Sequence, residues 1–290
     1  MLGPYGKGAQ VIRCGLCDQD RRLLRSHIIP EFFYKPVYGK NHRLYTRIDG
    51  RLASAPPLQK GLRERLLCSE CEQAFGKLEG HVQRILYGKA ATAALAPYSR
   101  TRRPQVATDD AARFSRIEAA SVAGFWTRGE VHFTGVDYKT VRLFGLSLLW
   151  RMAVASHVMW HGVQLADDGP AIKAMIIRAD VGAYDRYPFV CMIPLFGGRF
   201  FPDSILQPDR IDTSDGFVIR TVLGGYLFVF LGSRPYRDDA LTPFFVRPDG
   251  SWTLPIVDAM DLDFLRYDAA HIDAAIKAEV WTSGRAPREA

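Results

Sequence analysis

LLCSECEQ, residues 66–73, places two cysteines two residues apart at the point where a strand-like run changes into a helical one. A second pair with the same spacing lies in RCGLCD, residues 13–18. Two Cys-x-x-Cys pairs can supply the four thiolates of a tetrahedral zinc site, whereas a redox pair would need a βαβ context that this sequence lacks. We therefore predict one structural zinc ion bound by Cys14, Cys17, Cys68 and Cys71.

The segments between the two cysteine pairs predict strands and a hairpin. RRLLRSHIIPEF, residues 21–32, has the composition of a strand that leaves the first pair and ends at Pro30. Asp49 and Gly50 form a dipeptide typical of a tight hairpin turn. GLRERLL, residues 61–67, predicts a strand that enters the second pair, in which Arg63 and Arg65 alternate with Leu62, Glu64 and Leu66 and so project from one face.

The second cysteine pair opens a predicted helix over about residues 70–88. Ser69 is the candidate N-cap, and Glu72 stands three residues later, which is the spacing of a capping box. Glu79 follows Glu72 by seven residues and falls on nearly the same helix face, because seven residues turn a helix by about 700°. Glu72 can therefore serve either as a cap or, together with Glu79, as a cation ligand.

A change of composition predicts two domains. PYSRTRRPQVATDD, residues 97–110, is rich in proline and charge and is the predicted linker. It separates a zinc module at residues 10–96 from a larger α+β domain at residues 111–290, whose role we predict as recognition or assembly. The fold class is therefore α+β, with a small zinc-stapled module followed by a mixed domain.

The larger domain reads as helices first and strands later. Helical patterns cover residues 110–126 and 137–160, and a last helix is predicted at 268–281. The predicted short strands, joined by Gly and Pro turns, are 189–196, 216–232 and 243–256.

Positive charge is concentrated in the first third of the chain, although the net charge is only +7. Through residue 108 there are 19 Lys and Arg against 8 Asp and Glu, whereas the remainder has 19 against 23. Phosphate neutralisation supplies most non-specific affinity for nucleic acid, so this imbalance predicts a polyanionic partner; a solvated basic surface is the alternative. The candidate phosphate contacts are Lys60, Arg63, Arg65, Arg102 and Arg103.

The longest apolar run, residues 141–165, is interrupted by Arg142 and Arg151. A spanning helix needs about 20 largely apolar residues, and a charge at mid-bilayer costs at least about 2.5 kcal/mol. We therefore expect a buried helix and no membrane contact. The polar N-terminus lacks the apolar region of a signal peptide, so we expect a cytoplasmic protein.

Three further residues with ligand chemistry read as packing residues. His157 and His161 stand one helical turn apart, but the run between them contains no Glu, so a zincin site is excluded. Cys191 lies in the apolar run FVCMIPLF and is expected to be inert core.

A cysteine pair, a strand that ends in histidine, a variable hairpin, and a cysteine pair that opens a helix together resemble the treble-clef ββα-metal module of HNH and endonuclease VII-type nucleases. The resemblance covers about residues 10–88, under a third of the chain. It implies a metal-dependent endonuclease that hydrolyses phosphodiester bonds in nucleic acid, DNA being the first candidate. By analogy alone, nuclease modules fused to larger domains suggest a role in prokaryotic defence, with a homo-oligomer or a protein partner bound through the larger domain.

The resemblance assigns roles to three positions. His27 occupies the place of the general base, and a neutral imidazole can take a proton from water at physiological pH. Glu72 occupies the place of a residue that helps to hold a catalytic divalent cation, magnesium or manganese. The family's Asp before the histidine is Ser26 here, so Glu72 and Glu79 would have to supply the cation ligands.

Each of these roles has an alternative. His27 can be a structural histidine, and Glu79 can be a solvated helix residue. The alternative function is a non-catalytic zinc module that binds nucleic acid or a protein, which Ser26 favours. A shared solvent-open point for the His27 imidazole and a carboxylate would favour catalysis.

Overall fold

The computed structural model describes most of the chain and has a mixed α+β fold, as the sequence predicts. The described residues are 12–38, 47–48, 51–52, 61–98, 113–118, 121–122, 125–202, 204–214, 216–232 and 241–266. The predicted helix at 268–281 lies outside them, as do Lys60, Arg102 and Arg103.

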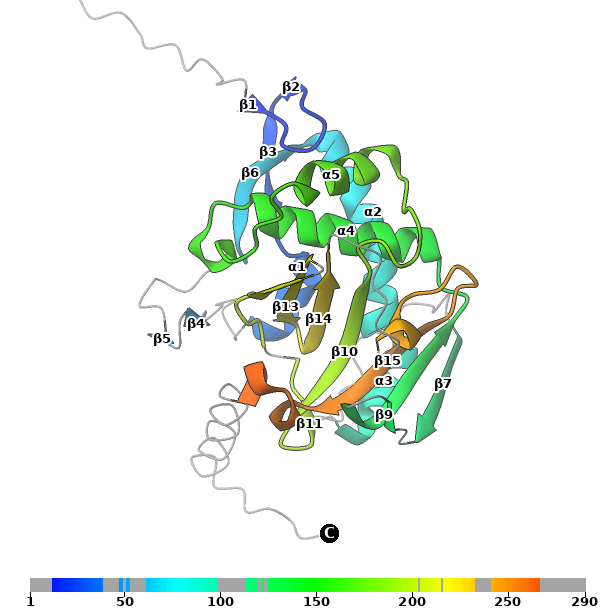
Figure 1. Ribbon diagram of the computed structural model, residues 1–290. Helices are drawn as coiled ribbons and strands as arrows, with labels where there is room; N and C mark the ends of the chain where they lie inside the picture. Colours follow the sequence, from blue (N-terminus) through cyan, green and yellow to red (C-terminus); the bar gives the residue numbers. More distant parts are fainter. Residues whose placement is uncertain are drawn as a thin grey trace, which may run out of the picture.

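The first cysteine pair lies between two short strands, and the second pair joins a strand to a helix. Strand β1 (Ile12–Arg13) pairs antiparallel with β2 (Asp20–Arg21), and β3 (Leu23–His27) pairs antiparallel with β6 (Arg63–Cys68). Helix α2 (Ser69–Tyr87) begins directly after β6. We call residues 12–27 and 61–87 the cysteine module; its strands stand at the top of Figure 1, and α2 runs down from them behind α4.

The segment between β3 and β6 contains a one-turn helix and a small hairpin. Helix α1 (Glu31–Tyr34) follows Pro30 and continues as a 3₁₀ turn (Lys35–Val37). Strands β4 (Arg47–Ile48) and β5 (Arg51–Leu52) pair antiparallel on either side of residues 49 and 50, which confirms the predicted hairpin.

The rest of the described chain is built on one nine-stranded sheet. Its main path runs in the order β12-β13-β14-β10-β15-β9-β7, and only β10 and β15 pair parallel. The strands on this path are β7 (Arg113–Glu118), β9 (Phe125–Thr134), β10 (Phe189–Phe196), β12 (Asp209–Thr213), β13 (Gly216–Leu223), β14 (Tyr226–Leu231) and β15 (Trp252–Asp258). The short strands β8 (Ser121–Val122) and β11 (Arg199–Phe200) pair with β9 and β10.

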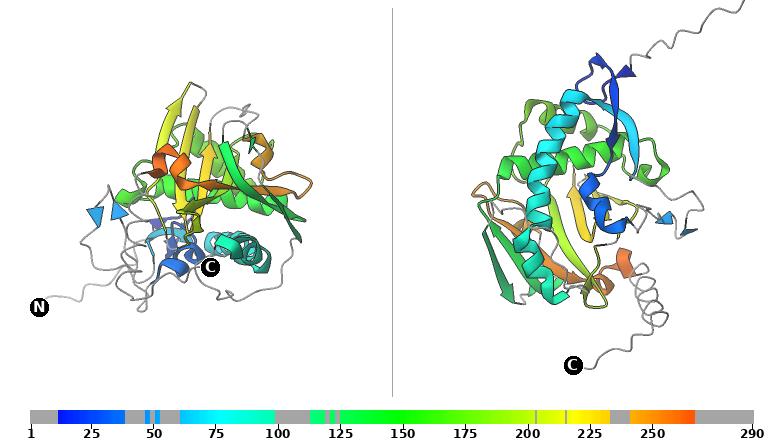
Figure 2. Two further views of the ribbon diagram at one scale, coloured as in Figure 1. Left: turned by 90° about the horizontal axis from the view of Figure 1, so that it is seen from below. Right: turned by 180° about the vertical axis from the view of Figure 1, so that it is seen from behind.

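One face of the sheet is covered by helices. Helix α4 (Tyr138–Val154) crosses this face, and α2 and α5 (Asp168–Arg178) pack against α4, as the right view in Figure 2 shows. Gly145 of α4 lies so close to the Phe189 ring of β10 that a Cβ atom would overlap it. Helix α3 (Lys89–Leu95) and the 3₁₀ turn Ala96–Tyr98 continue from α2. The sheet and α4 therefore share one apolar interface.

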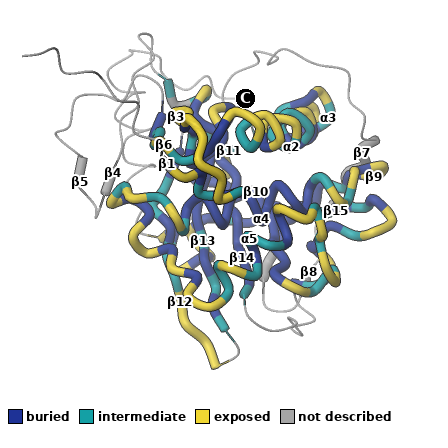
Figure 3. Tube along the Cα trace, turned by 90° about the horizontal axis from the view of Figure 1, so that it is seen from above, coloured by how far each residue is buried: buried dark blue, intermediate teal, exposed yellow. Residues whose placement is uncertain are grey.

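The opposite face of the sheet is also apolar. Side chains of β10 and β14, such as Val190 and Val229, form a second core cluster with Phe244 and Leu262. Short 3₁₀ turns at Thr242–Phe244 and Ala259–Asp261 belong to this cover. Figure 3 shows β10, β14 and α4 as buried along nearly their whole length. The centre of the sheet is thus covered on both sides.

The cysteine module and the sheet are joined by a continuous apolar core. The Phe33 ring lies 5.5 Å from the Phe228 ring, centroid to centroid, and both belong to one buried cluster that also contains Cys14 and Cys68. The Tyr87 hydroxyl donates a 2.7 Å hydrogen bond to the Gly224 carbonyl. The two-domain division remains a prediction, and core residues from both sides of the predicted linker pack together.

Two predicted elements are wrong. The described part of residues 110–126 forms β7, β8 and the start of β9, where we predicted a helix. Alanine and glutamate favour a helix, but pairing with β9 in the sheet overrides this local preference. The N-cap of α2 is Cys68 in place of Ser69, because β6 runs directly into the helix, so the capping box with Glu72 does not form.

The remaining predictions of elements mostly hold. Helix α4 confirms the start of the predicted helix at 137–160, but it ends at Val154, and only a 3₁₀ turn (Val158–Trp160) follows. Helices α1, α3 and α5 were not predicted, and only the part of the predicted strand 243–256 from Trp252 onward forms a strand, β15. In the described part of the chain, no helix is both long and apolar enough to cross a bilayer.

Candidate metal centre and basic strand surface

The four paired cysteines come together in space. Their Sγ atoms all lie within 4.8 Å of one another, and the Sγ atoms of Cys17 and Cys68 are 3.8 Å apart. A zinc ion bound tetrahedrally at about 2.3 Å from each sulfur separates the sulfurs by about 3.8 Å. The four thiols could therefore hold a metal ion such as zinc.

Backbone amides support this centre. The Cys68 amide donates to the Cys14 Sγ atom at 3.3 Å. Burial raises the pKa of the Cys14 thiol, but amide hydrogen bonds from Cys17, Cys68 and Leu16 outweigh burial and lower the pKa to about 7. Metals bind the thiolate, so the lower pKa favours metal binding at Cys14, whereas burial raises the pKa values of the Cys68 and Cys71 thiols.

The first cysteine pair is fixed to β6 by a tight turn. The Gly15 amide donates to the Leu66 carbonyl at 3.0 Å, and the Asp18 amide donates to the Cys14 carbonyl at 3.0 Å. A Cβ atom on Gly15 would lie 2.9 Å from the Leu66 side chain, so glycine permits this approach. The Asp18 carboxylate accepts a 2.7 Å bond from Lys173 of α5.

The pairing of β3 with β6 determines which side chains share a face. Arg25 stands opposite Arg65, and His27 stands opposite Arg63. Directly opposed residues, and residues two apart on one strand, project to the same side of a sheet. These four residues therefore occupy one surface, which we call the arginine face.

Burial agrees with this assignment. Arg25 and Arg65 are exposed, and His27 and Arg63 are half-buried, whereas Ser26 between them is fully buried. Within the described part of the chain, no carboxylate pairs with the three arginines. Like charges directly opposite each other destabilise a strand pair, so the opposed Arg25 and Arg65 fit a surface that binds an anion.

Arg25 was not among the predicted phosphate contacts. The register shifts at an irregularity between Leu24 and Arg25, and the shift brings Arg25 opposite Arg65. Neither strand alone reveals such a shift, although alternation did predict that Arg63 and Arg65 share a face. The His27 ring itself lies 6.3 Å from the buried Tyr34 ring, centroid to centroid.

The opposite face of β3 and β6 contacts the residues that follow α4. Ser26 and Glu64 are opposite each other on this face. The Glu64 carboxylate accepts hydrogen bonds from the Ser156 amide and hydroxyl at 2.9 and 2.8 Å and from the His157 amide at 2.9 Å. Because Ser26 projects here, an aspartate in its place would not lie on the arginine face.

The two predicted cation ligands, Glu79 and Glu72, have different surroundings. The Glu79 carboxylate forms a 2.7 Å ion pair with the Arg151 guanidinium, which is almost completely buried. One carboxylate oxygen of Glu72 is buried and has no hydrogen-bond partner among the described residues. Among the described residues, the four cysteines are the one group of three or more Cys, His, Asp or Glu ligand atoms that lie close enough to share a metal. His27, Glu72 and Glu79 do not form a second.

The other singled-out residues have structural contacts. The His157 Nδ1 atom accepts a bond from the Met159 amide, and the His161 Nε2 atom lies 3.0 Å from the Ser156 carbonyl oxygen. Cys191 is fully buried, and burial raises the pKa of its thiol, as expected of inert core.

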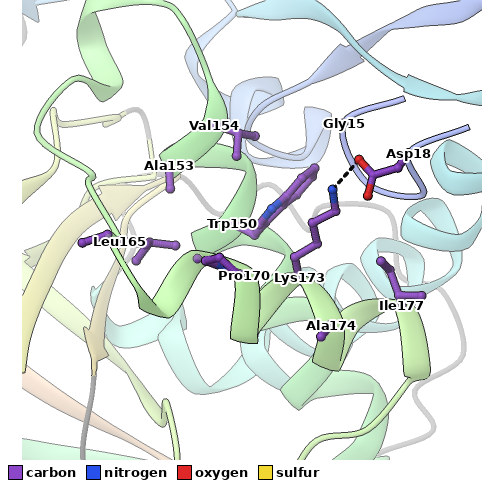
Figure 4. A pocket seen from close by; sticks show the side chains of 12 residues that line it. Gly15, Asp18, Trp150, Ala153, Val154, Leu165, Pro170, Lys173, Ala174 and Ile177 are labelled. Atoms are coloured by element: carbon purple, nitrogen blue, oxygen red, sulfur yellow. Dashed lines mark hydrogen bonds and ion pairs between the residues drawn. The ribbon is translucent and has the colours of Figure 1, made fainter. Parts of the chain in front are cut away.

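A pocket of about 640 Å³ lies beside the cysteine module (Figure 4). Helix α4 contributes Trp150 and Val154 to its wall, and α5 contributes Ile177. The ion pair between Asp18 and Lys173 closes one side. The pocket is separate from the arginine face, and its lining is mainly apolar.

Comparison of the chain with models of protein families, with curated proteins and with solved structures gives no match.

Proposed function

We propose that the cysteine module is a zinc-stapled treble clef of the HNH type that binds nucleic acid on its arginine face and hydrolyses a phosphodiester there. The observation that carries this proposal is the strand register that puts His27 on one outward surface with Arg25, Arg63 and Arg65. Guanidinium groups pair well with phosphate oxygens, and a histidine among them is within reach of water that attacks the phosphorus.

In the proposed reaction, His27 acts as the general base. It takes a proton from a water molecule whose oxygen bonds to phosphorus as the bond to the leaving oxygen breaks. The leaving oxygen takes a proton from solvent. The three arginines position the phosphate and stabilise the negative charge on its oxygens in the transition state.

The zinc ion would be structural. Four thiolates would fill its coordination shell, leaving no open position for water, so its contribution is to hold β6, α2 and the first cysteine turn together. A catalytic magnesium or manganese ion is implied by the resemblance, with Glu72 in the family's ligand position. Glu79 forms an ion pair with Arg151, so we do not propose it as a cation ligand. The proposed reaction includes no step that depends on a bound cation.

The test is cleavage of plasmid DNA and of RNA with magnesium, with manganese and without added cation. We expect H27Q to lower the rate by about 10²- to 10⁴-fold, the usual contribution of a positioned general base. H161Q, which changes an exposed histidine outside the arginine face, is the control. Zinc content should stay the same in both variants. Equal cleavage by wild type and H27Q would refute the catalytic role.

Binding is tested separately from cleavage. Each arginine that contacts phosphate should contribute about one unit to the slope of log affinity against log salt, so R25A and R65A should each reduce it by about one. R199A removes an exposed arginine on β11 and should leave the slope unchanged. Equal slopes for all variants would exclude the arginine face as the binding surface.

The second candidate is a non-catalytic module that binds nucleic acid. It is favoured by the pairing of Glu79 with Arg151, which removes one of the two predicted cation ligands. Salt-dependent binding with no cleavage under any metal condition would select this function.

A further inference from the structure

The end of helix α4 contacts the strand that carries His27. Arg151, in the last turn of α4, is only 1% exposed. Its Nη1 atom donates to the His27 carbonyl oxygen at 3.0 Å and to the Glu79 carboxylate at 2.7 Å. The guanidinium carbon lies 5.0 Å from the centroid of the Phe75 ring. One buried cation therefore contacts both β3 and α2.

The residues that follow Arg151 contact the third element of the module. Glu64 of β6 accepts the amide hydrogens of Ser156 and His157 together with the Ser156 hydroxyl. The segment 151–157 thus contacts β3, β6 and α2 at once. The Glu64 contacts are on the side opposite the arginine face, so they can fix its position without covering it.

A second arginine on α4 provides the comparison. Arg142 is also 1% exposed, but its guanidinium donates to backbone carbonyls outside the cysteine module. These belong to Val181, Ala183, Arg186 and Tyr187. The two residues share a helix and a degree of burial, and only Arg151 reaches the histidine strand.

We infer that Arg151 is a positioning residue for His27: it fixes the main chain at the end of β3 and so aims the imidazole across the arginine face. A hydrogen bond to the His27 carbonyl restrains the peptide plane next to the His27 Cα atom, and hence the direction of the side chain. Glu79 holds the guanidinium in place. The catalytic consequence rests on the proposed function, whereas the effect on the histidine does not.

The experiment compares R151M with R142M in the full-length, zinc-loaded protein. Both substitutions remove a buried guanidinium from α4, so both include the loss of stability that this change causes anywhere in the helix. The first readout is the NMR spectrum of ring-labelled histidine; the chain has seven histidines, and H27Q assigns the His27 signal. The second readout is kcat and KM for nucleic acid cleavage. R151K, whose ammonium lacks the planar fork of arginine, takes the place of R151M if that variant does not fold.

We expect R151M to shift the His27 signal and to lower kcat by about 10- to 100-fold with little change in KM, because a displacement of about 1 Å can cost that much. R142M should change neither readout. A His27 signal and a kcat in R151M that match those of R142M would overturn the inference. If wild type cleaves no nucleic acid, the proposed catalysis fails, and the His27 signal alone decides whether Arg151 positions the residue.

Discussion

The cysteine module and the central sheet are held together in different ways. All eight residues of β10 and all six of β14 are buried, between α4 on one face and the second core cluster on the other. Strand β3 has five residues, of which Leu24 and Arg25 are exposed. The centre of the sheet uses its side chains for packing, whereas one face of the β3–β6 pair remains available to a ligand.

The difference has a physical cause. A two-stranded sheet is at best marginally stable in water, because it buries too little apolar surface to offset the loss of chain entropy. The cysteine module compensates with four thiols that could bind a metal and with the contacts from residues 151–157. Because the thiol cluster and residues 151–157 stabilise the strand pair, the exposed side chains of the arginine face are not needed for packing.

The largest expected effect comes from removing the proposed structural zinc ion. Structural zinc contributes about 10–16 kcal/mol to the folding of small zinc peptides, so a chelator should open the cysteine module locally. We expect hydrogen exchange to accelerate in residues 12–27 and 61–75, while the buried strands β10 and β14 keep their protection. C68S should reproduce the effect, and C191A, which removes a thiol outside the centre, should retain the metal. Unchanged exchange in the module after metal removal would contradict this comparison.

A core substitution tests whether the two regions unfold together. Phe228 is fully buried in β14 and contacts Phe33 of the segment between β3 and β6, so F228A should cost about 3–5 kcal/mol in unfolding free energy. Because the Phe33 ring also packs against the Tyr87 ring of the cysteine module, exchange should accelerate in both regions. F196A, on the opposite face of the sheet, is the matched control and should spare the module. Urea denaturation and hydrogen exchange measure the two effects; identical exchange maps would argue against the shared core.

The smallest expected effect is at the N-terminus of α4. Asp137 caps this helix by accepting bonds from the Thr140 amide at 3.1 Å and hydroxyl at 2.7 Å. D137A should therefore cost about 1 kcal/mol at pH 7. The Thr140 bonds also lower the pKa of Asp137, so its charge-dependent stabilisation is present above the ordinary pKa of about 4 and is lost as pH falls through the lower folded value.

Denaturation midpoints of wild type and D137A at pH 7 and pH 3 measure this cap. The difference between the two proteins should shrink at pH 3, and D137N, which keeps a capping oxygen without the charge, should show little of this pH dependence. A constant difference across pH would mean that the carboxylate charge contributes nothing.

Local sequence predicted those parts of the fold in which neighbouring residues carry the signal. Alternation identified β6, apolar runs identified β10, β13 and β14, and the cysteine spacing anticipated the thiol cluster. The prediction for 110–126 was wrong because its composition favours a helix, while sheet pairing with a distant strand decides its structure. The capping role of Glu72 was wrong because a capping box assumes a free helix start.

The residues of the candidate site also fall into two groups, those that the sequence identified and those that it did not. His27, Arg63 and Arg65 were identifiable from their positions between the cysteine pairs. Arg25 was not, because its place depends on an irregular register that involves both strands. The role of Arg151 was also hidden, since 124 residues separate it from His27 and nothing in either segment indicates their contact.

By itself, the sequence determined the four thiols, the surplus of positive charge in the first third and the strands β10, β13 and β14 of the sheet. These properties depend on residue types and short spacings, which the chain carries whatever its fold. Only the tertiary structure decided that Arg25, Arg63 and Arg65 share a face with His27 and that Arg151 binds Glu79. Strand register and helix packing place groups that are far apart in the chain within a few ångströms, and no local pattern encodes such distances.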